Sequence, residues 1–246
     1  MNKTHNYLLT IIVPVFNEEG NIARLEKELT HFLKIAKVPS CVLFVNDGSK
    51  DQSGVLIKQV CQNHSDFYFI ELSKNSGLSA ALKAGIDYTQ SEYVGYIDAD
   101  LQTSPEDFNL LLEHAKEYEL VMGIRTGRKD NPVKKISSKI ANSFRRSITH
   151  DGVKDTGCPL KILHSQSAKR IPFFTGMHRF LPALIQLQNG HVKQIPVRHF
   201  ERMAGESKYK LSNRLMGPFK DCFAYRWMKK RYINYEITAN NLSVEA

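Results

Sequence analysis

Five short apolar runs punctuate the first half of the chain. Each is five to eight residues long, is rich in Val, Ile, Leu, Phe or Tyr, and is bounded by polar or turn-forming residues. Such runs are typical of strands that are buried on both faces of a sheet. They predict strands at residues 8–15, 41–45, 67–72, 93–97 and 120–124.

Amphipathic segments separate these runs. Residues 21–36 carry apolar side chains at helical spacing, as at Ile22 and Leu25. Three more helices are expected: one after a cap at Asp51 or Ser53, one over residues 77–88, and one opened by Ser104 and Pro105. The alternation of strand and helix predicts a doubly wound α/β domain with a mostly parallel sheet.

The pattern changes after residue 125. An apolar residue recurs every fourth position from Ile136 to Ile148, which predicts a helix with basic residues off its apolar stripe. Beyond it, the pattern predicts strands at residues 157–163 and 192–197, with a helix over residues 179–188 between them.

The last third of the chain carries a second stripe of this kind. It runs from Leu211 to Trp227, and Gly217-Pro218 is predicted to break it into two helices. The expected organisation is a catalytic α/β domain over residues 1–210, amphipathic basic helices over 211–233 and a tail over 234–246.

Charge is distributed unevenly along the chain, which the net charge does not show. The net charge is +9, from 34 Lys and Arg against 25 Asp and Glu. Residues 1–124 carry a net charge of −7, whereas residues 125–170 carry +9 and residues 198–231 carry +7. The basic stretches indicate a phosphate-bearing partner, which can be a nucleic acid, a nucleotide or an anionic membrane.

Several function classes lack their sequence signatures. The four cysteines have no paired spacing, which argues against a zinc site or a disulfide framework and favours a reduced, cytosolic setting. No glycine-rich dinucleotide motif, phosphate-binding loop or nucleophile elbow occurs. No stretch approaches the roughly 18 to 20 apolar residues that span a bilayer.

Polar clusters follow three of the predicted strands. Asp98 and Asp100 flank Ala99 at the end of a strand, where a divalent cation bridging to phosphate oxygens would neutralise them. Gln102 is near enough to add a neutral oxygen. The alternative is a solvated turn that caps the next helix.

The other candidate residues have equally plain structural alternatives. Asp47 can bind a nucleobase or ribose or can form an Asx turn, and Glu18 can be an ordinary acid of a first helical turn. Two basic groups can grip phosphates or can be solvated surface. The first comprises Arg202, Ser207 and Lys208; the second comprises Arg125, Lys134, Lys135 and Ser138.

Together these motifs resemble those of the family 2 inverting glycosyltransferases. The matching segments are Ile12-Val13-Pro14-Val15-Phe16-Asn17-Glu18-Glu19, Val45-Asn46-Asp47-Gly48-Ser49 and Asp98-Ala99-Asp100-Leu101-Gln102. Two later segments resemble the dolichol-phosphate or polyprenol-phosphate mannosyltransferase branch: Asp155-Thr156-Gly157-Cys158 and the residues Arg202, Gly205 and Ser207-Lys208-Tyr209. The resemblance covers residues 8–231.

The resemblance implies a fold of the GT-A type, a nucleotide-sugar donor and a role for each matching residue. Asp100 and Gln102 would ligate Mg²⁺ or Mn²⁺ beside Asp98, and the catalytic set would be Asp98, Asp100 and Arg202. The nucleotide-sugar site would comprise Pro14, Val15, Asn17, Glu18, Asp47, Ala99, Arg202 and Lys208 together with the two acids. Arg125, Lys134 or Lys135, and Ser138 would hold the acceptor phosphate.

A phosphate acceptor simplifies the expected chemistry. Its oxygen is ionised near neutral pH, so we expect no essential general base. GDP-mannose is the favoured donor, and the alternative is a UDP-sugar that carries glucose or an aminosugar. We expect the protein at the cytoplasmic face of a membrane, reached through an amphipathic surface or a partner subunit.

A nucleic-acid-binding protein is the non-enzyme alternative. The basic stretches motivate it, but no RNA or DNA motif occurs and the acidic strand ends stay unexplained. Nucleic acid is therefore not an expected partner.

Overall fold

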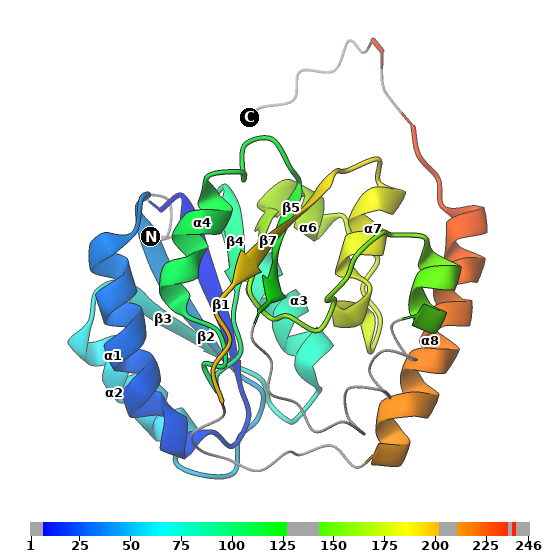
Figure 1. Ribbon diagram of the computed structural model, residues 1–246. Coiled ribbons are helices and arrows are strands. Elements are labelled where there is room, and N and C mark those ends of the chain that lie inside the picture. The colour runs from blue at the N-terminus through cyan, green and yellow to red at the C-terminus, as the bar shows by residue number, and fades with distance from the viewer. Residues whose placement is uncertain (1–6, 127–142, 202–210, 236–237, 240–246) are drawn as a thin grey trace.

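The computed structural model describes residues 7–126, 143–201, 211–235 and 238–239, with the backbone alone for 211–218. Its centre is one seven-stranded sheet with the order β3-β2-β1-β4-β6-β5-β7 (Figure 1). The strands are β1 (Leu9–Val15), β2 (Ser40–Asn46), β3 (Phe67–Glu71), β4 (Tyr93–Tyr96), β5 (Leu120–Arg125), β6 (Lys161–His164) and β7 (Val192–Val197). All neighbours pair in parallel except β6, which is antiparallel to both β4 and β5. The predicted mostly parallel sheet is confirmed.

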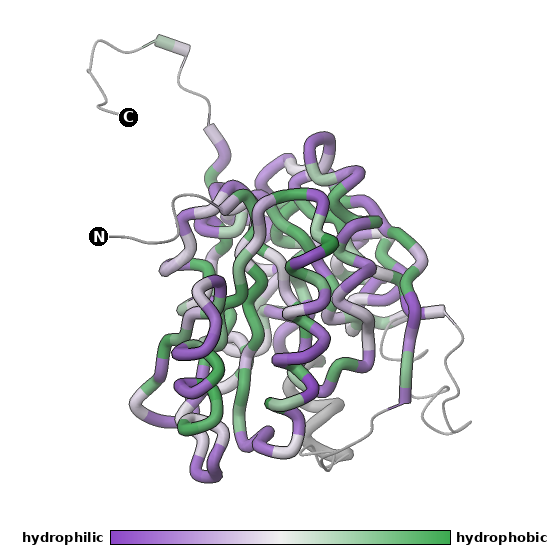
Figure 2. Tube along the Cα trace, turned by 90° about the vertical axis from the view of Figure 1, so that its left-hand side faces the viewer, coloured by the Kyte–Doolittle hydropathy of each residue, from purple (hydrophilic) through white to green (hydrophobic). Residues whose placement is uncertain are grey.

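Helices cover both faces of the sheet. They are α1 (Glu19–Ile35), α2 (Ser53–Asn63), α3 (Leu78–Tyr88), α4 (Phe108–Leu112), α6 (Ser165–Lys169), α7 (Leu181–Leu187) and α8 (Leu211–Arg231), with short 3₁₀ turns at Pro105–Asp107 and Met177–Arg179. A further helix occupies residues 143–149. Figure 2 shows hydrophobic residues along the central strands and alternating bands of hydrophobic and hydrophilic residues on the helices.

Alternation along β1 divides the interior into two cores. Leu9, Ile11 and Val13 face a core that contains α1, α2 and α4, whereas Ile12 faces a second core with α3, α6 and α7. Successive strand residues point to opposite faces, so an apolar residue at every position serves both cores. The continuous apolar runs of the sequence are explained by this arrangement.

The direction of the chain across the sheet reverses beside β1. The chain passes from β1 to β2 and β3 on one side and then returns to place β4 on the other side of β1. In open α/β sheets such a switch point leaves a crevice beyond the carboxyl ends of the strands, where ligands bind. The polar residues after β1, β2 and β4 all lie at this edge.

Three local predictions need correction. The strand expected at 157–163 begins only at Lys161, because residues 157–160 form turns and irregular chain. The helix expected over 179–188 is shorter, Leu181–Leu187, and a 3₁₀ turn precedes it. Two helices separated at Gly217-Pro218 are wrong, since α8 continues through both residues. A proline costs one backbone hydrogen bond but can kink a helix without ending it.

Candidate active site

The strand-end loops after β1 and β2 interlock. The backbone N–H of Asn17 donates to Ser49 Oγ at 3.0 Å, and the Lys50 N–H donates to Asn17 Oδ1 at 2.8 Å. The Glu18 N–H donates to Ser53 Oγ at 2.8 Å. These bonds join the two loops that were predicted to line the nucleoside pocket, and they leave Pro14 partly exposed beside the buried Val15.

Asp47 is anchored by the loop before α3. Its Oδ1 accepts the Ser76 N–H at 2.7 Å and its Oδ2 accepts the Gly77 N–H at 2.8 Å. Gly48 follows at φ 65°, and a Cβ there would lie 2.5 Å from the Lys74 carbonyl carbon. The buried carboxylate thus holds the loop before α3 through distant backbone donors, a contact other than the local Asx turn given as the alternative, at the edge where a nucleoside role was predicted.

The turn after β4 carries the paired acids. Its backbone closes through a hydrogen bond from the Leu101 N–H to the Asp98 carbonyl at 3.2 Å, and Leu101 has a φ of 47°. A left-handed conformation costs a non-glycine residue roughly 1–2 kcal/mol. Ala99 and Leu101 are buried in the first core and hold this turn in place. The strained turn presents two carboxylates at the switch point.

Asp98 is the most perturbed acid of the site. Its Oδ1 accepts the Tyr96 hydroxyl at 2.5 Å. Loss of solvent and, second, the neighbouring Asp100 raise the pKa of Asp98 to about 6. The Tyr96 hydrogen bond and the charges of Lys161 and Arg125 oppose this rise. A positive charge placed beside this pair would favour its ionised form.

Asp100 is more enclosed. It is buried, and its Oδ1 accepts the Gln102 N–H at 3.3 Å. Gln102 is itself fixed through its carbonyl oxygen, which accepts the Phe200 N–H at 2.8 Å and lies 3.0 Å from His199 Nδ1. Asp98, Asp100 and Gln102 therefore share one short turn, as their spacing predicted.

Two cations, Arg125 and Lys161, lie close enough to Asp98 to affect its pKa. Arg125, at the end of β5, makes a two-pronged ion pair with Asp155, with Nε–Oδ2 and Nη2–Oδ1 both 2.8 Å. Gly157 makes room for the guanidinium, because a Cβ there would lie 3.0 Å from Nη2. Lys161 is buried at the start of β6, donates to the Cys158 carbonyl and lies 5.5 Å from the centre of the Tyr96 ring. Burial lowers the pKa of Lys161, and the charge of Asp98 partly offsets this.

The donor set fits a divalent cation that also binds the substrate. Among the described residues, no group of three or more His, Cys, Asp or Glu side chains could hold a metal. The turn offers two carboxylates and the amide oxygen of Gln102, and Mg²⁺ and Mn²⁺ commonly complete such partial sets with substrate phosphates and water. The fit is therefore to a metal held jointly with a phosphate ligand.

Several predicted residues lie outside the described part of the chain. They are Lys134, Lys135, Ser138, Arg202 and Lys208. Their roles stay predictions.

Sequence reasoning missed Tyr96, Lys161 and the pairing of Asp155 with Arg125. Lys161 had a visible signal, because it is the one charge in an otherwise apolar stretch, Leu160–Leu163. Tyr96 stands two residues before Asp98 on the same side of the strand, where alternation brings their side chains together. Asp155 stands in a segment that carries the family resemblance, but its pairing with Arg125 had no local signal, since the two residues are 30 positions apart.

Comparison with known proteins identifies the family. Residues 10–174, two thirds of the chain, match the sequence profile of Glycosyl transferase family 2. The chain belongs to this family. The match contains β1 to β4 and the turn with both acids.

Curated family relatives are similar over most of the chain. The dodecaprenyl-phosphate galacturonate synthase of Rhizobium johnstonii is 32% identical over 83% of this chain and 62% of its own length. The undecaprenyl-phosphate 4-deoxy-4-formamido-L-arabinose transferase of Edwardsiella ictaluri is 30% identical over 82% of this chain and 63% of its own. The chain thus spans somewhat less than two thirds of these relatives.

Solved structures share the fold. Glucosyl-3-phosphoglycerate synthase from Mycobacterium tuberculosis, in complex with Mn²⁺, UDP-glucose and phosphoglyceric acid, aligns at a TM-score of 0.67 and 14% identity over 94% of this chain and 82% of that one. The mannosyltransferase PcManGT from Pyrobaculum calidifontis, with GDP-mannose and Mn²⁺, aligns at 0.62 and 16% over 93% and 71%. The expected GT-A type of fold is confirmed.

Proposed function

We propose that the protein transfers a sugar from a nucleotide-sugar to a polyprenyl phosphate with inversion at the anomeric carbon. The observation that carries the proposal is the turn of Asp98 and Asp100 at the switch point of a family 2 glycosyltransferase fold. The two curated relatives are named for dodecaprenyl phosphate and undecaprenyl phosphate, which supports a polyprenyl phosphate as the acceptor.

We favour a UDP-sugar over GDP-mannose as the donor. The resemblance to the mannosyltransferase branch favoured GDP-mannose, but the two relatives are named for galacturonate and for a formamido-arabinose. The stated alternative, a UDP-sugar that carries glucose or an aminosugar, agrees better with these names. Mannose transfer of the dolichol-phosphate type is not supported.

We assign activation of the donor to the turn that carries Asp98 and Asp100. Asp100 and Gln102, with Asp98 beside them, would hold Mg²⁺ or Mn²⁺, which when bound supplies positive charge to the leaving diphosphate. Metal-bearing neighbours of the same fold support this assignment. Pro14, Val15, Asn17, Glu18, Asp47 and Ala99 would line the donor pocket, with Arg202 and Lys208 on the diphosphate.

The acceptor needs no general base in this mechanism. A phosphate monoester is ionised near neutral pH, so positioning its oxygen opposite the leaving group suffices. Arg125 would orient that phosphate, together with Lys134 or Lys135 and Ser138. Because Nε and Nη2 of Arg125 bind Asp155, the proposal gives the acceptor the remaining Nη1 donors.

A polyprenyl phosphate is a membrane lipid, so this proposal sets the reaction at a membrane surface, and we propose the cytoplasmic face. None of the helices in the described ranges is both long and apolar enough to cross a bilayer. Contact with the membrane would then rest on a peripheral surface or on a partner subunit.

A donor screen tests the function. UDP- and GDP-sugars are each incubated with undecaprenyl phosphate and Mg²⁺ or Mn²⁺, and lipid-linked sugar is measured. We expect product with a UDP-sugar; product with no pair would overturn the proposal. Asp100→Ala should lower the rate at least about 100-fold, whereas the exposed Asp87→Ala on α3 should not change it.

The acceptor role has its own test. Arg125→Ala should raise the acceptor KM at least about tenfold and leave the affinity for UDP, measured by calorimetry, within about twofold. An equal loss of both would contradict the assignment of Arg125 to the acceptor. Circular dichroism checks that the variant is folded.

A further inference from the structure

Helix α8 exposes a row of aromatic side chains. Phe219, Phe223 and Trp227 are 45%, 48% and 64% exposed, although large apolar side chains usually lie inside. They are spaced four residues apart, so at 100° per residue they fall within an arc of about 80° on one side of the helix. We call these three residues the aromatic row.

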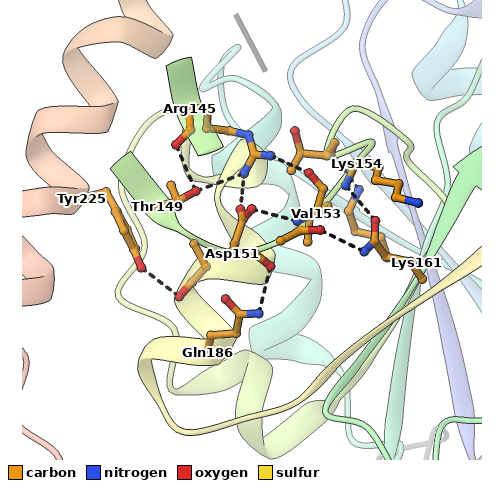
Figure 3. Close-up of polar contacts among 12 residues, drawn as sticks. Arg145, Thr149, Asp151, Val153, Lys154, Lys161, Gln186 and Tyr225 are labelled. Carbon is orange, nitrogen blue, oxygen red and sulfur yellow. Dashed lines mark hydrogen bonds and ion pairs between the residues drawn. The ribbon is translucent and has the colours of Figure 1, made fainter. Parts of the chain in front are cut away.

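The opposite side of α8 is already occupied. Cys222 and Tyr225 are buried in the second core, and the Tyr225 ring stacks on Phe180 at 6.0 Å between centroids. The Tyr225 hydroxyl donates to the Ala183 carbonyl at 3.4 Å (Figure 3). The aromatic row is therefore not a core face that has lost its partner, because α8 has a separate packed face.

Helix 143–149 fixes one end of the row. Phe144 stacks on Phe219 at 4.7 Å, and Phe219 contacts Phe223 edge-on at 5.2 Å. Arg145 of this helix pairs with Asp151 and donates to the Val153 carbonyl at 3.1 Å in the loop that follows it (Figure 3). Gln186 of α7 donates to the Asp151 carbonyl at 3.1 Å, which links this loop to α7.

Cations flank the aromatic row. From residue 219 to the end of α8 there are five basic residues, all exposed, and one acid. At 100° per residue, Lys220, Arg226, Lys230 and Arg231 fall within about 80° of the middle of the row, whereas Lys229 falls on the side of Cys222 and Tyr225. The acid, Asp221, is partly buried and faces Gly176, so it does not neutralise the outer side. Arg231 lies 5.6 Å from the Trp227 ring.

We propose that this face of α8 lies on the surface of an anionic lipid bilayer. Aromatic rings seat at the level of the headgroups, and Lys and Arg side chains around them meet anionic lipids, which is how interfacial helices bind. Binding of this kind goes beyond the sugar transfer and does not depend on it. Figure 1 shows α8 along one side of the molecule, starting at the end where β1 ends.

The charges on α8 favour an anionic bilayer over a second copy of the chain or a nucleic acid. A second copy would set the same cations against each other, and the centres of protein interfaces are poor in Lys. Single-stranded nucleic acid binds in grooves with aromatic floors, whereas this row lies on the convex outer side of a helix. An anionic bilayer matches both the rings and the charges.

Trp227 provides a direct probe, because it is the single tryptophan of the chain. The full chain is mixed with vesicles of phosphatidylcholine alone or with 30% phosphatidylglycerol, without acceptor or donor. We expect flotation with the anionic vesicles, a blue shift of Trp227 emission, and quenching by lipids brominated near the headgroup. An unshifted, unquenched emission with bound protein would place the contact elsewhere and overturn the proposal.

Matched double variants test whether α8 makes the contact with the vesicles. Phe223→Ser with Lys230→Gln should weaken binding to anionic vesicles at least about tenfold. The control, Tyr88→Ser with Lys34→Gln, removes a more exposed ring and an exposed cation from α3 and α1 and should leave binding unchanged. Equal loss in both variants would overturn the assignment to α8.

Two further measurements distinguish other occupants and the proposed reaction. A blue shift that grows with protein concentration in the absence of vesicles would indicate a second copy instead. Transfer to a short, water-soluble polyprenyl phosphate should be the same in Phe223→Ser with Lys230→Gln as in the unaltered protein. Failure of transfer with intact vesicle binding would count against the proposed reaction and not against this surface.

Discussion

Three buried carboxylates, Asp47, Asp151 and Asp155, are held in two different ways. In the first half, Asp47 takes backbone N–H groups on both oxygens, from Ser76 and Gly77. In the second half, Asp151 and Asp155 are each paired with an arginine. Backbone donors carry no net charge, so Asp47 is stabilised without a neutralising cation, whereas Asp151 and Asp155 are each neutralised by their arginine.

Asp98 and Asp100 differ from both groups. They adjoin each other on one short turn, and the charge of Asp100 contributes to the raised pKa of Asp98. The nearby cations, Arg125 and Lys161, are engaged with Asp155 and with backbone carbonyls. The comparison teaches that the proposed metal and donor site brings two carboxylates together, whereas Asp151 and Asp155 are each matched to an arginine.

Breaking an arginine–aspartate pair should have the largest effect on stability. Asp151→Ala removes the partner of the buried Arg145, and an uncompensated buried charge costs about 3–5 kcal/mol of unfolding free energy. Urea denaturation followed by circular dichroism measures the loss. A change below about 1 kcal/mol would mean that this pair is not what holds helix 143–149 to the body.

The next effect has the opposite sign and depends on pH. The pKa of Asp98 rises to about 6 in the folded protein from an ordinary value of 3.8, so folding favours its protonated form. This stabilisation is fully present below pH ~4 and is lost as the pH rises through about 6. Asp98→Asn should therefore raise the unfolding free energy by up to about 3 kcal/mol at pH 8 and change it little at pH 4.

The measurement uses metal-free protein in EDTA, so that only the carboxylate contributes. A gain of equal size at both pH values would show that packing, and not charge, is responsible. The same substitution should lower transfer activity, because it removes one of the two charges proposed at the metal.

A smaller loss is expected where backbone donors hold the acid. Asp47→Asn keeps one acceptor oxygen but turns an amide NH₂ toward the second backbone N–H, at a cost of about 1–2 kcal/mol. Thermal unfolding at pH 7 measures it. A loss as large as that of Asp151→Ala would remove the distinction between the two halves.

The sequence predicted the strands that position the site better than the hydrogen bonds and ion pairs within it. The strands were predictable because apolar runs buried on both faces leave a continuous signal, and each acid group follows such a run directly. The partners of those acids come from distant segments: Ser76 and Gly77 for Asp47, and Asp155 for Arg125. No local spacing encodes these pairs, because they depend on how the sheet is ordered.

Capping residues, glycine and proline predicted the ends of helices less well. Ser104 and Pro105 do open a helical segment, as a 3₁₀ turn that leads into α4, but Ser104 makes no capping bond and its hydroxyl accepts from Arg198 Nη2 at 3.1 Å. Gly217-Pro218 does not end α8. Tertiary partners override such signals where an element has a packed face to support it.

The smallest effect on stability is expected for an exposed ion pair between two side chains of one helix. Lys83 and Asp87 pair along one exposed side of α3, four residues apart, and water screens them. Lys83→Gln should lower the unfolding free energy by less than about 0.5 kcal/mol, and the loss should vanish at 1 M NaCl. Chemical denaturation at low and high salt checks this. A loss above about 1 kcal/mol that survives high salt would show that solvent exposure does not separate this pair from the buried pair of Arg145 and Asp151.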